Sequence, residues 1–159
     1  MTTANKNLSF FDKNLIPDVS DFKFGIVVSK WNKKITDKLL NGVLETLKSF
    51  NVSKSNIIIF KVPGSFELIY GAKKINKKNV DVIICLGSII KGETKHFDFI
   101  SSSVANGIKD LNIHLDIPVI FGVLTDDNEQ QAIDRSGGKY GNKGVEAAIT
   151  AIEMLNLGR

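Results

Sequence analysis

Residues 80–87 of the chain read VDVIICLG, a short apolar run rich in β-branched residues, and three similar runs occur elsewhere in the sequence. These are FGIVVS at 24–29, NIIIFKV at 56–62 and PVIFGVL at 118–124. Each run is almost continuously apolar rather than alternating, which is typical of strands that are covered on both faces in a parallel sheet. The four runs therefore predict four parallel strands with helices on both sides of the sheet.

The segments between and after these runs have helical spacing. Apolar side chains from Ile35 to Phe50 fall on one stripe, which predicts an amphipathic helix. Four more helices are predicted: from Phe66 to about Lys77, from about Thr94 to Leu111, over 127–135 and over 144–155, with a break at Gly137-Gly138. The order predicts an α/β fold, a three-layer α/β/α sandwich with a four-stranded parallel sheet and flavodoxin-like topology.

In open sheets of this kind, ligands bind beyond the carboxyl ends of the strands, so functional residues are expected there. The 159 residues fit one domain, which we place at 21–159. Residues 1–20 show no clear period, and we interpret them as a tail that docks on a neighbouring subunit.

Composition argues against several classes of partner. The net charge of +4 comes from 21 Lys and Arg against 17 Asp and Glu, and the lysines are dispersed rather than clustered, so no nucleic acid partner is expected. The N-terminus lacks a secretory pattern and no apolar run approaches the ~20 residues of a membrane span. The single cysteine, Cys85, lies in an apolar run and fits a reducing compartment. We therefore expect a cytoplasmic protein without a membrane contact.

Two of the predicted strands lead into aromatic and polar residues. The first ends at Ser29 and is followed by Trp31, whose ring either stacks on a flat ligand or packs between loop and helix. The second is followed by Ser65, Phe66 and Glu67, which either hold a polyhydroxylated ligand or serve as an ordinary helix start.

The third strand leads into the most informative segment, LGSIIKGETKHFD at 86–98. Gly92 lets the backbone approach a ligand, and the amides of Glu93 and Thr94 open a helix whose positive end suits a phosphate. His96 lies in the first turn of that helix, where the partial positive charge disfavours imidazolium. It is predicted to be a neutral base near pH 7, unless it merely caps or packs.

Beyond the fourth strand, Arg135 either clamps a phosphate with its guanidinium fork or lies free on the surface. His114 lies in a polar stretch near a helix end and is interpreted as a surface residue. The sequence has no metal-ligand spacing, no Walker loop and no dinucleotide fingerprint, so neither a metal nor a nucleotide cofactor is indicated.

From about Phe22 to Leu157, the order and spacing of these segments resemble the lumazine synthase family. The matching blocks are GIVV at 25–28 with Trp31-Asn32, VPGSFE at 62–67, LGSIIKGETKHFD at 86–98, PVIFGVLT at 118–125, and DRSGGK at 134–139 leading to GNKG at 141–144. One departure is Lys91, which stands where the family commonly has Arg; this removes a bidentate fork but keeps the charge.

The resemblance implies a transferase of riboflavin biosynthesis that condenses 5-amino-6-(D-ribitylamino)uracil with 3,4-dihydroxy-2-butanone 4-phosphate. The product is 6,7-dimethyl-8-ribityllumazine, and no cofactor is required. It also implies contacts to the uracil substrate from Trp31, Ser65, Phe66, Glu67, the backbone of Ser88, Ile89 and Ile90, and Phe121. Glu93, Thr94 and Arg135 would hold the phosphate of the second substrate, and His96 would transfer protons.

The resemblance further implies a homo-oligomer. Its active sites would lie between neighbouring subunits of a pentamer, with Phe121 and Arg135 supplied by one chain and the remaining residues by the next. The compact link from Arg135 to Gly144 is similar to that of members whose pentamers form a hollow 60-subunit icosahedral shell, and riboflavin synthase is a possible enclosed partner.

Two other hypotheses about the function remain open from sequence alone. A non-catalytic relative would store lumazine or flavin in the same cleft, although it would need neither His96 nor Arg135. A flavodoxin-like binding or signalling domain would account for the alternation of strands and helices, but the phosphate loop of such a domain is missing.

Overall fold

The computed structural model of the chain describes residue 9 and residues 18–157. Its strands are β1 (Phe24–Ser29), β2 (Ile57–Val62), β3 (Val82–Ile90), β4 (Val119–Asp126), β5 (Ser136–Gly138) and β6 (Gly141–Asn142). Its α-helices are α1 (Lys33–Ser49), α2 (Leu68–Ile75), α3 (His96–His114), α4 (Glu129–Arg135) and α5 (Lys143–Leu155), with 3-10 turns η2 (Lys54–Asn56) and η3 (Asn76–Lys78). The predicted tail at 1–20 lies almost entirely outside the described residues.

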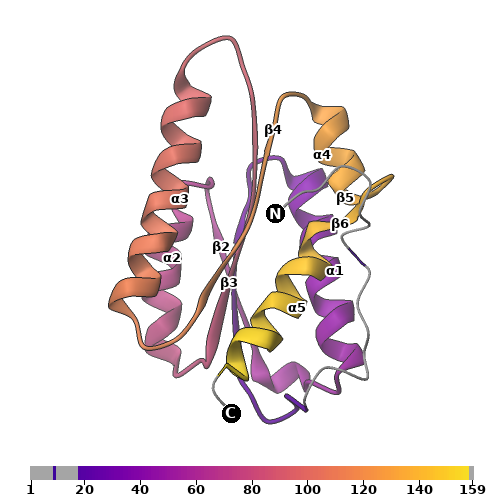
Figure 1. Cartoon of the computed structure of the whole chain (residues 1–159), viewed down its shortest axis with the longest axis vertical. Coiled ribbons are helices and arrows are strands. Elements are labelled where there is room, and N and C mark those ends of the chain that lie inside the picture. The colour runs from indigo at the N-terminus through magenta and orange to yellow at the C-terminus, as the bar shows by residue number, and fades with distance from the viewer. Residues whose placement is uncertain (1–8, 10–17, 158–159) are drawn as a thin grey trace.

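The main sheet has four parallel strands in the order β2-β1-β3-β4. Figure 1 shows α2 and α3 on one face of this sheet and α1, α4 and α5 on the other. The predicted three-layer α/β/α fold with flavodoxin-like topology is thereby confirmed. Because the strands are parallel, their carboxyl ends meet at one edge of the sheet, where Ser29, Val62, Ile90 and Asp126 lie.

The core forms two layers, because successive side chains of a strand point to opposite faces. On β1, Ile26 and Val28 pack in the cluster that α1 and α5 cover, whereas Val27 packs in the cluster under α2 and α3. On β3, Cys85 is fully buried in the second cluster, as predicted, and burial raises the pKa of its thiol to about 12. Both faces of the central strands are therefore apolar, which explains their continuous apolar runs.

A close backbone contact fixes α5 against α1. A Cβ atom added to Gly144 would lie 2.0 Å from the carbonyl oxygen of Leu39, so only glycine allows this approach. The side chain of Asn142 caps α5 by accepting from the amide of Gly144 and donates to the carbonyl oxygen of Lys38. Asn142 thus ties β6 and the start of α5 to α1.

Several helix ends differ from the prediction by two or three residues, and further differences lie at two strand ends and one loop. Strand β3 continues past Gly87 to Ile90, and β4 continues past Leu124 to Asp126, since Ile89 and Ile90 pair with the end of β4. The break expected at Gly137-Gly138 is a short antiparallel hairpin, β5–β6, which requires a positive φ at Gly137 and Gly141.

Within the described residues, no helix has the length and apolar character needed to cross a membrane.

Candidate active site

A cleft of about 570 Å³ opens beyond the carboxyl ends of β1, β2 and β3, next to the start of α3. Its volume falls within the usual range for small-molecule sites. The lining comprises Trp31, Gly64, Ser65, Phe66, Glu67, Ser88, Ile89, Ile90, Gly92, Thr94, His96, Phe97 and Ile100. The structure therefore brings together nine of the twelve site residues that the sequence predicted.

Trp31 stands at the rim of this cleft on a short, well-fixed loop. Its amide donates to the carbonyl oxygen of Pro63 and to the hydroxyl of Ser29. These hydrogen bonds anchor the loop to the segments at the ends of β1 and β2. Its side chain is 71% exposed, and the alternative of a Trp packed between loop and helix is therefore wrong for the single chain.

The next residue, Asn32, has a left-handed backbone with φ 53°, a conformation that Asn tolerates better than most residues. Its side-chain amide donates to the carbonyl oxygen of Ser88 at 3.0 Å. Asn32 thereby joins the Trp31 loop to the end of β3 and keeps the two walls of the cleft together. No role was predicted for Asn32 from sequence, although an Asn in the loop between a strand and a helix is a signal for such a turn.

Ser65, Phe66 and Glu67 form the wall before α2. Glu67 is the N-cap residue of α2, yet it makes no side-chain cap hydrogen bond, which disfavours the reading of this segment as an ordinary helix start. The Ser65 side chain is buried, and a Cβ at Gly87 would lie 2.6 Å from its Oγ, so Gly87 makes room for it. The ring of Phe66 is 51% exposed at the rim.

The floor of the cleft is the end of β3. Ser88 is 1% exposed, and its Oγ has no hydrogen-bond partner within the described part of the chain. Buried hydroxyls nearly always have a partner, so an unpaired one in the wall of a cleft marks a place where a ligand can bind. Ile89 is buried beside it and Ile90 is half-buried.

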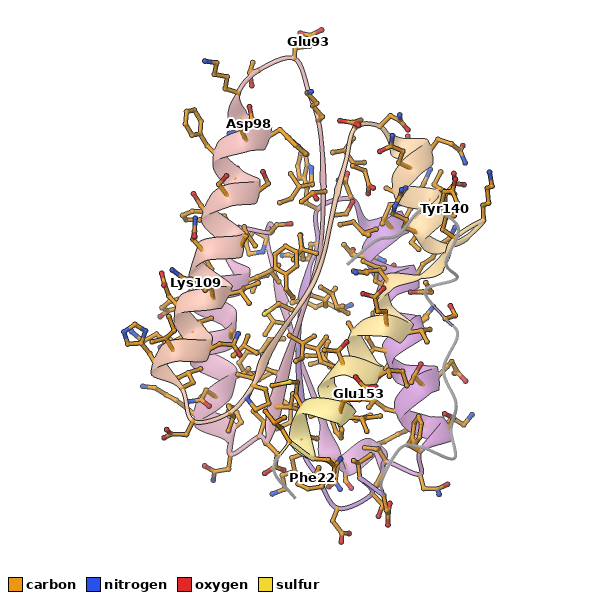
Figure 2. All side chains as sticks on the ribbon, viewed as in Figure 1. Phe22, Glu93, Asp98, Lys109, Tyr140 and Glu153 are labelled. Atoms are coloured by element: carbon orange, nitrogen blue, oxygen red, sulfur yellow. The ribbon has the colours of Figure 1, made fainter. Side chains whose placement is uncertain are left out.

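His96 is the first residue of α3, and its exposed side chain lines the cleft. The hydroxyl of Thr94 accepts from the amide of His96 at 3.3 Å, which orders the turn before the helix. Nothing lies within 4 Å of the space that a Cβ on Gly92 would occupy, so the backbone here is open to a ligand. Glu93 lies at the far tip of the loop between β3 and α3 (Figure 2) and does not contribute to the lining.

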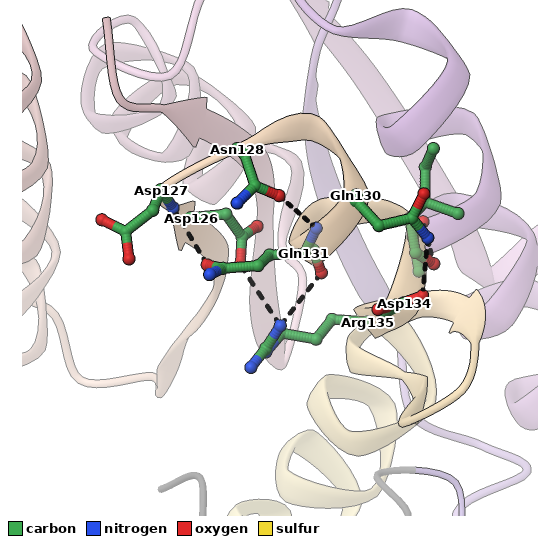
Figure 3. A network of polar contacts seen from close by, with 9 residues as sticks. Asp126, Asp127, Asn128, Gln130, Gln131, Asp134 and Arg135 are labelled. Carbon is green, nitrogen blue, oxygen red and sulfur yellow. Dashed lines mark hydrogen bonds and ion pairs between the residues drawn. The ribbon is translucent and has the colours of Figure 1, made fainter.

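Phe121 and Arg135 lie away from this cleft. Phe121, on β4, is 37% exposed and lines a separate hollow together with Lys143 and Glu146. Arg135 ends α4, where one nitrogen of its guanidinium contacts the carbonyl oxygen of Gln131 (Figure 3). In a single chain, Phe121 and Arg135 therefore lie outside the cleft that most of the predicted site residues line.

Two further predictions concern histidine and metals. His114 ends α3 and is exposed, as predicted, with its ring Nδ1 2.7 Å from the carbonyl oxygen of Asp110. Among the residues that the structure describes, no group of three or more His, Cys, Asp or Glu is placed to bind a metal ion.

Comparison with known proteins identifies the family. The family model for 6,7-dimethyl-8-ribityllumazine synthase matches residues 21–159. A 6,7-dimethyl-8-ribityllumazine synthase of Flavobacterium johnsoniae is 62% identical over 155 residues, which cover 97% of this chain and 82% of the relative. One from Christiangramia forsetii is 55% identical over 159 residues, which cover 99% and 95%. The chain therefore belongs to the 6,7-dimethyl-8-ribityllumazine synthase family.

Proposed function

We propose that the cleft beside α3 is the place where this chain, an enzyme of riboflavin biosynthesis, binds and condenses its two substrates. The reaction joins 5-amino-6-(D-ribitylamino)uracil and 3,4-dihydroxy-2-butanone 4-phosphate into 6,7-dimethyl-8-ribityllumazine, with release of phosphate and water. The observation that carries the proposal is that one cleft holds the exposed rings of Trp31 and Phe66 and the imidazole of His96.

The uracil substrate would bind along the walls formed by β1, β2 and β3. The exposed indole of Trp31 offers a flat face on which a pyrimidine can stack. Ser65 and Glu67 bring a hydroxyl and a carboxylate to the wall before α2, and both can bond to the hydroxyls of a ribityl chain. Ser88, Ile89 and Ile90 would complete the floor, where the unpaired Oγ of Ser88 adds a hydrogen-bonding group to the backbone groups expected from sequence.

The phosphate of the second substrate would lie at the start of α3. The amides of Glu93 and Thr94 precede a helix of 19 residues, whose N-terminus attracts an anion. The guanidinium of Arg135 would neutralise the phosphate from a second direction. Both substrates would then meet beside His96.

The chemistry needs positioning and proton transfer. The 5-amino group attacks the ketone, water leaves as the imine forms, phosphate is eliminated, and ring closure releases a second water. His96 would accept and return protons in imine formation and phosphate loss, while the cleft supplies the orientation of the two reactants.

Phe121 and Arg135 lie outside the cleft, which favours an active site shared between the subunits of a homopentamer. We propose that Phe121 and Arg135 complete the cleft of a neighbouring subunit, because neither lines the cleft of its own chain. Large exposed side chains such as Tyr70, Phe99 and Ile113 also fit surfaces that other copies cover.

The compact β5–β6 hairpin is compatible with a 60-subunit shell, with riboflavin synthase as a possible enclosed partner. The free thiol of Cys85 fits a cytoplasmic location.

A steady-state assay of the purified protein with both substrates tests this function directly. The native protein should form the lumazine, measured by its absorbance, and Arg135→Ala should lose most of this activity. If the native protein formed no product but bound a ribityllumazine analogue tightly, the protein would be a storage protein instead of an enzyme.

Size measurement in near-neutral phosphate buffer tests assembly, and free pentamers alone would exclude the shell.

A further inference from the structure

Arg135 has an acidic neighbour that the proposed reaction does not use. Asp126 ends β4, and its Oδ1 lies 3.8 Å from the Nη1 of Arg135 (Figure 3). The Asp126 side chain is 4% exposed and the Arg135 side chain is 27% exposed. Because the pair is largely shielded from water, its electrostatic interaction is screened less than that of a surface pair.

The carboxylate of Asp126 is only partly paired within the described part of the chain. Its Oδ1 makes the ion pair, whereas Oδ2 is buried without a hydrogen-bond partner in the described part of the chain. Burial raises the pKa of Asp126 and the charge of Asp127 raises it further, while Arg135 lowers it. The charge on Asp126 therefore depends on the guanidinium beside it.

Arg135 does not need Asp126 to keep its place. Its Nη1 donates to the carbonyl oxygen of Gln131 at 3.1 Å, and its guanidinium carbon lies 5.1 Å from the centre of the Tyr140 ring. These two contacts hold the side chain from two sides. What Asp126 adds is a negative charge next to the group that is expected to meet the phosphate.

We propose that Asp126 acts through Arg135: its carboxylate pairs with the guanidinium and competes for it with the phosphate of the substrate and of the product. The inference rests on the proposed role of Arg135 in phosphate binding. A phosphate at Arg135 and an ionised Asp126 repel one another, so the residue weakens phosphate binding and favours release of phosphate after the reaction.

The test compares the native full-length protein with Asp126→Asn, which keeps the shape of the side chain and removes its charge. The inhibition constant of inorganic phosphate and the KM for the butanone phosphate should both fall by about threefold, the effect of losing one partly exposed ion pair. The KM for the uracil substrate should not change. A variant whose site was merely damaged would instead have raised constants for both substrates.

Asp127→Asn is the matched control, because it removes the same charge from the next residue, whose side chain is exposed. It should leave the phosphate constants near the native values. If Asp127→Asn had the same effect as Asp126→Asn, or if Asp126→Asn left the phosphate constants unchanged or raised them, the inference would be wrong. Asp126→Ser is a second neutral variant, should the asparagine variant fail to fold, and should shift the constants in the same direction.

The pH dependence of the phosphate constants distinguishes the charge of Asp126 from a purely structural role of its side chain. As pH falls through the pKa of Asp126, the native residue becomes neutral like asparagine, so the difference between the two proteins should disappear at low pH and be largest at high pH. The ratio of their constants cancels the ionisation of phosphate itself. The charged groups that act on Asp126 are Arg135 and Asp127, whereas Lys91 contacts it through a backbone amide.

Arg135→Ala separates the two proposals. If it leaves inhibition by phosphate unchanged, the proposed role of Arg135 is wrong, and the inference about Asp126 fails with it. If Arg135→Ala weakens inhibition but Asp126→Asn has no effect, only the inference about Asp126 is wrong.

Discussion

His96 is the residue whose removal should affect the chemical step most directly. It lies exposed at the start of α3 and lines the cleft that is proposed to bind both substrates. We expect His96→Ala to lower kcat by about 10²- to 10⁴-fold, the usual contribution of a proton-transfer group, without abolishing the reaction. Steady-state kinetics measures the change.

His114 offers the matched control for this variant. It is also an exposed histidine of α3, but it lies at the opposite end of the helix. His114→Ala should retain the native rate. Full activity in His96→Ala would show that another group transfers the protons.

Cys85 gives a prediction about stability at high pH. Burial raises the pKa of its thiol from 9.0 to about 12, so the unfolded chain releases this proton first. The thiol's contribution to folding is constant below pH 9 and is lost as pH rises from 9 towards 12. Between pH 8 and pH 10, the advantage of the native protein over Cys85→Ala should shrink by about 1.4 kcal/mol. Denaturant unfolding of both proteins measures it, and a constant difference would contradict a buried thiol.

The fate of single side chains was only partly predictable from sequence. Residues in the segments that follow a strand, such as Trp31, Ser65 and His96, line one cleft as expected, because parallel strands bring their carboxyl ends to one edge. Asp126 was missed, because it lies beyond the apolar run at 118–124 that predicted β4. Its pairing with Arg135 depends on the fold of α4 back toward β4, which no local pattern reports.

The packing of α5 on α1 depends on a glycine. A methyl group on Gly144 would lie 2.0 Å from the carbonyl oxygen of Leu39, which is backbone and has little freedom to move. We expect Gly144→Ala to lower the free energy of unfolding by about 1–3 kcal/mol, the usual cost of overpacking. Thermal unfolding detects this as a lower Tm.

Gly92→Ala is the control for the loss of backbone freedom that any change from glycine to alanine brings, since a Cβ at Gly92 meets nothing within 4 Å. Its Tm should stay close to that of the native protein. If the two variants had the same Tm, the close contact between α5 and α1 would have no energetic role.

Elements were easier to predict than their ends. The strands and the five α-helices follow from runs of apolar residues and from helical periodicity, both of which repeat over many residues. The extension of β3 to Ile90 was missed because Gly87 and Ser88 resemble the end of a strand, whereas pairing with β4 continues the ladder through them. The β5–β6 hairpin was missed because it is short and depends on two positive φ angles.

The whole molecule decides whether a site is complete. In a single chain, His96 lines the cleft whereas Phe121 and Arg135 lie outside it. The cleft of one chain therefore contains most of the residues proposed to bind the uracil substrate, but of those proposed to bind the phosphate it contains only Thr94. A neighbouring copy that supplies Arg135 would make catalysis depend on assembly, and dilution below the dissociation constant of the oligomer should lower the specific activity.

Mixed oligomers test this sharing most directly. His96→Ala and Arg135→Ala subunits each lack one side of the proposed site, so either variant alone should be slow. In oligomers refolded together from equal amounts, about a quarter of the interfaces should pair an intact His96 with an intact Arg135 from the neighbour, because assembly in a ring is random. Activity well above that of either variant alone would follow. If His96 and Arg135 served the same site within one chain, no mixture would regain it, since every chain would carry one defect.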